Sequence, residues 1–69
     1  MEEKVIQEID RRIEILMEKT RTILIQYNDC LDKNTMETIL ANQEIIRNLS
    51  YEKGKLETIV RVKKELLSQ

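Results

Sequence analysis

Apolar residues recur at alternating steps of three and four along the first half of the chain, and this spacing limits the fold more than any other feature. Such spacing places side chains on one stripe of an α-helix, at the a and d positions of a heptad. Met17, Leu24 and Leu31 follow the d positions and widen the stripe. The width predicts a helix with neighbours on two sides, as in a four-helix bundle. The a and d residues are Ile6, Ile9, Ile13, Leu16, Thr20, Ile23, Tyr27 and Cys30.

The second half of the chain carries three columns that repeat every seven residues. They predict a second amphipathic helix, again with a buried stripe wider than a two-stranded seam needs. The a column is Ile39, Ile46, Lys53, Val60 and Leu67; the d column is Asn42, Leu49, Leu56 and Lys63; the g column is Ile45, Glu52, Ile59 and Leu66.

We expect helices over residues 3–31 and 35–67, joined by a turn at 32–34. Asn34 followed by Glu37 has the pattern of a capping box, which marks a helix N-terminus. At 1.5 Å per residue the helices are about 43 and 50 Å long, so they match in an antiparallel pair. The predicted fold is a single all-α domain over residues 1–69, an antiparallel two-helix hairpin that dimerises into a four-helix bundle.

Folding the chain at the turn pairs residues whose numbers sum to about 65. Ile9 then meets Leu56, Leu16 meets Leu49, Ile23 meets Asn42, Tyr27 meets Ile39, Ile13 meets Glu52 and Lys53, and Lys63 falls beside Glu2. Apolar residues meet in most layers, which favours this register. The predicted core or dimer interface is Ile9, Ile13, Leu16, Ile23, Leu24, Asn42, Ile46, Leu49, Leu56 and Val60.

Gly54 lies inside the second predicted helix, where glycine costs roughly 1 kcal/mol relative to alanine. We expect the helix to continue, because the Leu49, Leu56 and Lys63 column shows no phase jump there. The alternative is that the helix ends at Glu52 and a third helix begins at Lys55.

Polar residues interrupt the buried columns at Asn42, Glu52 and Lys53. Asn42 is either a buried selector of register and oligomeric state or an amide at the rim that reaches water. For Glu52 and Lys53 we expect long stems along the edge of the core with their charges in solvent. The alternative is a buried polar layer or a ligand-contacting pair.

The composition argues against most site chemistry. With 12 basic and 13 acidic residues the net charge is -1, without the basic excess of nucleic-acid-binding proteins. Histidine is absent, and the only cysteine is Cys30, beside two aspartates that raise rather than lower a thiol pKa. We interpret Cys30 as a small apolar residue. We expect no cofactor, metal or small-molecule substrate, and no catalytic residues.

The segment Met1–Lys4 is acidic and no long apolar core follows it, so we expect no signal peptide. No window approaches the ~20 apolar residues of a membrane span, so no membrane contact is expected. A lone thiol fits a reducing compartment, which predicts a cytoplasmic protein.

Several apolar residues fall outside the buried columns. Such residues are normal when scattered, but paired ones on a small domain suggest a contact surface. We expect the hairpin to bind itself as a homodimer and to bind a second, unidentified protein. Regulators, inhibitors and assembly factors of bacteria and phages often have this form. The candidate partner-binding residues are Ile15, Ile25, Met36, Leu40 and Tyr51.

Two alternatives remain. The segment Asn42-Gln43-Glu44-Ile45-Ile46 resembles the Ser-Gln-Glu-Leu-Asp signature of small helical-hairpin phosphatases, with Gln43 and Glu44 matching. That resemblance implies a hairpin that removes phosphate from an aspartyl-phosphate response regulator of spore-forming bacteria. The other alternative is weak binding of nucleic acid or a membrane surface through basic residues of the second helix: Lys53, Lys55, Arg61, Lys63 and Lys64.

Overall fold

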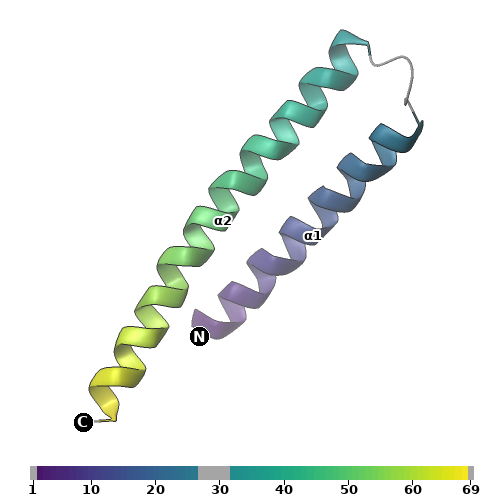
Figure 1. Ribbon diagram of the computed structural model, residues 1–69. Helices are drawn as coiled ribbons and strands as arrows, with labels where there is room; N and C mark the ends of the chain where they lie inside the picture. Colours follow the sequence, from purple (N-terminus) through teal and green to yellow (C-terminus); the bar gives the residue numbers. More distant parts are fainter. Residues whose placement is uncertain (1, 27–31, 69) are drawn as a thin grey trace.

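The chain forms two α-helices that lie side by side and run in opposite directions (Figure 1). The computed structural model describes residues 2–26 and 32–68. Helix α1 spans Glu2–Gln26 and helix α2 spans Lys33–Leu67, so α2 is longer by ten residues. The hairpin measures 58 × 15 × 14 Å. The all-helical fold and the packing of one helix against the other confirm the predicted hairpin.

Helix α2 begins two residues earlier than predicted, and its N-cap is Asp32 rather than Asn34. The Asp32 side chain accepts a hydrogen bond from the backbone N–H of Thr35 at 2.7 Å. The Asp32 carbonyl accepts another from the N–H of Met36 at 3.0 Å. The predicted turn at 32–34 was therefore wrong, because an ionised carboxylate caps the positive end of the helix before Asn34 is reached.

Helix α2 continues through Gly54 without a break, as expected, so no third helix begins at Lys55. The backbone of Gly54 has no positive φ angle. A Cβ atom placed there would meet no heavy atom within 4 Å. Gly54 therefore lies on an open side of the helix.

The two helices pack through the predicted a and d columns. In α1 the least exposed apolar residues are Ile6, Ile9, Ile13, Leu16 and Ile23, and in α2 they are Ile39, Ile46, Leu49, Leu56 and Val60. Asn42 and Lys53, which share these columns, are also partly covered. The a and d columns are confirmed from Ile6 to Ile23 and from Ile39 to Val60. Lys63 and Leu67, at the end of α2, are exposed instead of buried, and the flanking residues predicted to widen the stripe are exposed in the single hairpin: Met17, Leu24, Ile45, Glu52, Ile59 and Leu66. Tyr27, Cys30 and Leu31, with the pairing of Tyr27 and Ile39, lie outside the described residues.

Ion pairs between the helices fix the register close to the predicted one. Lys63 pairs with Glu2, as expected from the sequence. The Lys53 ammonium lies 2.6 Å from the Asp10 carboxylate, and the contact raises the pKa of Lys53. The stem of Lys53 lies at the core edge and its charge reaches a rim carboxylate, close to the expected arrangement, whereas Glu52 is exposed.

The core between the helices is thin. Over residues 2–26 and 32–68 only Ile9, at 8% exposure, and Thr20, at 7%, are buried. The other seam residues keep partial access to solvent. Two helices alone therefore leave much of their apolar surface in water, as expected for a chain too short to enclose a core by itself.

Candidate functional site

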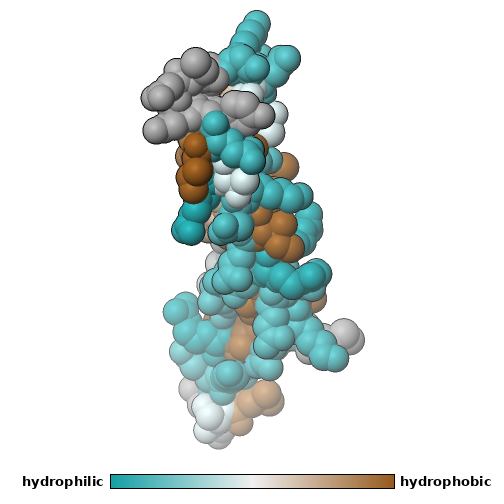
Figure 2. Space-filling view, turned by 90° about the vertical axis from the view of Figure 1, so that its right-hand side faces the viewer, coloured by the Kyte–Doolittle hydropathy of each residue, from teal (hydrophilic) through white to brown (hydrophobic). Residues whose placement is uncertain are grey.

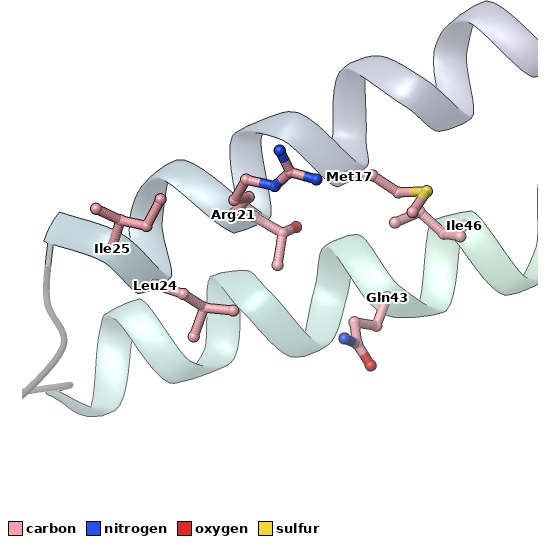
Figure 3. Close-up of a pocket in the computed structure, with 7 residues that line it drawn as sticks. Met17, Arg21, Leu24, Ile25, Gln43 and Ile46 are labelled. Carbon is pink, nitrogen blue, oxygen red and sulfur yellow. The ribbon is translucent and has the colours of Figure 1, made fainter.

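The flanks of the buried stripe form two apolar surfaces. The first is a groove of about 590 Å³ between α1 and α2, near the end of the hairpin where α1 ends and α2 begins, which we call the turn end (Figure 3). We call this first surface the Met17 groove. On α1, Met17 and Leu24 lie beside the buried stripe, and both are exposed. Its full lining is Met17, Thr20, Arg21, Leu24, Ile25, Gln43 and Ile46.

The Met17 groove has apolar walls and a polar rim. Its buried polar group is the Thr20 hydroxyl, which donates to the Leu16 carbonyl at 2.9 Å. Arg21 lies at the rim, 3.8 Å from Glu18, and Gln43 brings an amide from α2. A groove with this composition suits the apolar stripe of another helix, with polar groups at its edges.

Leu40 lies next to the Met17 groove, one turn before Gln43 on α2. Leu40 is exposed, and Met36, one turn further toward the turn, is exposed as well. The structure therefore gathers three of the five predicted partner-binding residues, Ile25, Met36 and Leu40, around one end of the hairpin.

The second surface lies on the other flank of the seam. Arg12, Ile15, Leu16 and Ile45 line one hollow of about 210 Å³ there. A neighbouring hollow of about 650 Å³ includes Ile15, Lys19, Ile23, Thr38 and Asn42. Seven-residue steps extend this surface along both helices. We call it the Ile45 face and define it by Val5, Arg12, Ile15, Lys19, Ile45, Glu52, Ile59 and Val62.

The two surfaces lie on opposite sides of the hairpin. In an antiparallel helix pair the e flank of one helix adjoins the e flank of the other, and g adjoins g. Met17 and Gln43 occupy e positions, whereas Arg12 and Ile45 occupy g positions. A single partner on one side therefore leaves the other surface open. Figure 2 shows separate patches of hydrophobic surface among hydrophilic side chains along one side of the molecule.

The structure separates other residues that the sequence analysis grouped together. Ile15 belongs to the Ile45 face, away from Ile25. Tyr51 points outward beside Lys55, whose ammonium lies 4.9 Å from the ring centroid. Leu24, predicted for the core or dimer interface, lines the Met17 groove. Val5 was missed, although its seven-residue spacing from Arg12 places it on the Ile45 face.

Carboxylates accompany the basic residues of α2. Lys55 lies 3.4 Å from Glu52, and Lys64 lies 3.8 Å from Glu3. Lys53 and Lys63 pair with Asp10 and Glu2 of α1. Arg61 shares a hollow with Glu57 and Glu65. These contacts neutralise the basic residues of α2 locally, which weighs against a phosphate-binding surface.

The residues that resemble the phosphatase signature face different ways. Gln43 lines the Met17 groove, whereas Glu44 pairs with Arg47 at 3.0 Å on the exposed side of α2. Within the two described segments, no three acidic or cysteine side chains gather as a metal site would require. Neither helix, as described, has an apolar stretch long enough to cross a membrane.

Comparison with models of known protein families, with curated proteins and with solved structures finds no match. The geometry of the hairpin is therefore the basis for assigning a function. Its main features are the thin core and the two apolar surfaces on opposite sides.

Proposed function

We propose that this chain is a small non-catalytic protein–protein interaction module, which acts as a regulator, inhibitor or assembly factor through a dimer of helical hairpins. The observation that carries the proposal is the exposure of the apolar residues on both sides of the buried stripe. Met17 and Leu24 on one side and Ile45 and Ile59 on the other are all more than two-fifths exposed. Contiguous apolar surface on a small chain is typical of a contact site.

The dimer and the partner occupy opposite sides of the hairpin in this proposal. A second copy covers the Ile45 face, and the partner protein binds in the Met17 groove. The partner presents an amphipathic helix, because the groove between α1 and α2 has the apolar walls and polar rim that such a helix fits. We place the protein in the cytoplasm because its single thiol fits a reducing compartment.

Partner capture from the native cell, followed by mass spectrometry, tests the proposal. Ile25→Glu or Leu40→Glu should abolish capture of a protein that the wild type retains, because each brings a charge to the Met17 groove. Thr58→Glu is the matched control, since Thr58 is equally on the exposed surface of α2 but outside both surfaces. Tyr51→Glu tests whether the partner reaches beyond the groove. Equal capture by wild type, Ile25→Glu and Leu40→Glu would overturn the partner site.

Phosphatase activity remains a prediction from the resemblance at Gln43 and Glu44. It requires that excess protein shortens the lifetime of phosphate on a receiver domain. Gln43→Ala should then restore the full lifetime. An unchanged lifetime with wild-type protein would remove this alternative and leave the interaction module unaffected.

A further inference from the structure

We infer that the second copy packs on the Ile45 face with its turn at the same end of the bundle, so that α1 of each hairpin lies against α2 of the other. The inference deepens the proposed function and rests on it. The two-fold axis then runs parallel to the long axis of the hairpins. Charge complementarity between Arg12 and Glu52 selects this arrangement over the alternative with the turns at opposite ends.

Arg12 and Glu52 form one layer of the Ile45 face. The Asp10–Lys53 and Glu2–Lys63 contacts fix the register, and they place Arg12 and Glu52 at nearly the same height on neighbouring helices. Both side chains are exposed, and Arg12 lines the same hollow as Ile15 and Ile45. This layer therefore carries one positive charge on α1 and one negative charge on α2, and the Glu52 carboxylate also lies 3.4 Å from Lys55 of its own helix.

Apolar layers flank the charged layer. Val5, Ile59 and Val62 lie toward the open end of the hairpin, and Ile15 and Ile45 lie toward the turn. All five are between 41% and 48% exposed, an even exposure that one covering surface would remove. At 1.5 Å per residue, the face runs about 26 Å along α2 from Ile45 to Val62.

When the two-fold axis runs parallel to the hairpins, each layer of one copy lies level with the same layer of the other copy. Arg12 then faces the partner's Glu52, and Glu52 faces the partner's Arg12, which gives two attractive pairs. Val5 faces the partner's Ile59, so apolar layers meet apolar layers. Each α1 has an antiparallel α2 on both sides. Lys19, at the edge of the turn-proximal layer, packs its stem on the partner's Ile45 and extends its ammonium to water.

An axis perpendicular to the hairpins gives the opposite result. It places α1 against the partner's α1, and when centred on the charged layer it brings Arg12 to the partner's Arg12 and Glu52 to the partner's Glu52. Like charges at an interface are strongly unfavourable. Sliding by one heptad moves Arg12 against the partner's Val5 or Lys19, and neither supplies a carboxylate. The two arrangements therefore differ in charge pairing and not only in shape.

The Met17 side does not serve a second copy equally well. Its e positions are apolar near the turn, at Met17 and Leu24, but toward the open end they are Glu3 and Asp10 on α1 and Glu57 and Lys64 on α2. An interface along this side would cover these charges and the Lys64–Glu3 contact. The Met17 groove is thus left for the partner protein.

Charge reversal tests the face. Arg12→Glu and Glu52→Arg each place like charges opposite one another, so each variant alone should dimerise at least about tenfold more weakly than the wild type. An equimolar mixture of the two should recover the wild-type dissociation constant, because both interface pairs become attractive again. Arg47→Glu, an exposed charge outside the face, is the control and should leave the constant unchanged. Helicity by circular dichroism checks that each hairpin remains folded.

A distance measurement tests the direction. A spin label at Asn34→Cys in a Cys30→Ser background lies at the start of α2, next to the turn. With the turns at one end, the two labels of a dimer should lie within about 20 to 30 Å, since neighbouring helices are 8–10 Å apart. With the turns at opposite ends they would approach the full 58 Å length of the hairpin.

The possible outcomes separate the inference from the proposed function. A dimer with close labels, weakened by each single reversal and restored by mixing, supports the inference. A dimer with distant labels, or one insensitive to both reversals, overturns the inference and leaves a dimeric interaction module. A wild-type monomer overturns the dimer on which both rest.

Discussion

The Asn42 side-chain amide donates a hydrogen bond to the Thr20 hydroxyl at 3.5 Å. This contact joins α2 to α1 through two polar side chains in the partly buried interface between the helices. Thr20 is satisfied without it, because its hydroxyl donates to the Leu16 carbonyl. Asn42 thus has a seam partner and also lines a hollow of the Ile45 face. We propose that Asn42 selects register at some cost in stability.

Asn42→Leu should therefore stabilise the hairpin while relaxing its specificity. The leucine adds apolar burial worth roughly 1 kcal/mol, and no buried group loses its only partner. Thermal unfolding should show a higher midpoint, and sedimentation should show a mixture of oligomers. Thr58→Leu, on the exposed side of α2 and outside both apolar surfaces, is the control and should change neither property appreciably. A lower midpoint for Asn42→Leu would show that the amide contact stabilises the native state.

Gly54→Ala should stabilise the protein by up to about 1 kcal/mol, because alanine restores helix propensity in the interior of α2. No atom within 4 Å opposes the added methyl group. Denaturant unfolding measures the change, and Ser50→Ala, one turn earlier, should give a smaller gain. Destabilisation by Gly54→Ala would mean that another molecule packs closely against this side of the helix.

The cap at Asp32 should make stability depend on pH in the acid range. The hydrogen bond from the Thr35 backbone N–H lowers the pKa of Asp32 below its ordinary 3.8. Its contribution is therefore fully present above that value and is lost as the pH falls through the lowered folded pKa. Asp32→Asn keeps a capping side chain that does not titrate. The advantage of the wild type over Asp32→Asn should shrink below about pH 4, and a constant difference would contradict the cap.

The Lys53–Asp10 pair should make stability depend on pH in the alkaline range. The hydrogen bond to Asp10 raises the pKa of Lys53 above its ordinary 10.5. The stability it contributes is present below 10.5 and is lost as the pH rises through the raised folded pKa. Asp10→Asn should therefore be less stable than the wild type near neutral pH, and the two should converge at strongly alkaline pH. A persistent difference there would show that Asp10 acts by some other contact.

Much of the hairpin was predictable because heptad spacing reports burial directly. Ile9, Leu16, Leu49 and Leu56 all lie in the seam, as their spacing indicates. The start of α2 was missed because aspartate and asparagine are equally good cap residues. Only the hydrogen bond that the Thr35 backbone N–H donates to the Asp32 side chain decides between them.

The division of the apolar flanks was harder to predict. Seven-residue spacing assigns a residue to one face of its own helix. The side of the hairpin on which that face lies depends on how the two helices are paired. Ile15 and Ile25 look equivalent in the sequence because both lie outside the buried columns. In the hairpin they belong to different surfaces, since Ile15 adjoins Ile45 and Ile25 adjoins Leu24.

Sedimentation equilibrium of the wild-type protein at tens of micromolar determines whether two hairpins associate in solution. The thin core and the two exposed flanks predict a dimer, with a mass twice the 8.3 kDa of one chain. The mass should fall toward that of one chain in Ile45→Glu, which places a charge in the Ile45 face, and should remain that of a dimer in Thr58→Glu. A wild-type mass of 8.3 kDa across this range would contradict the account.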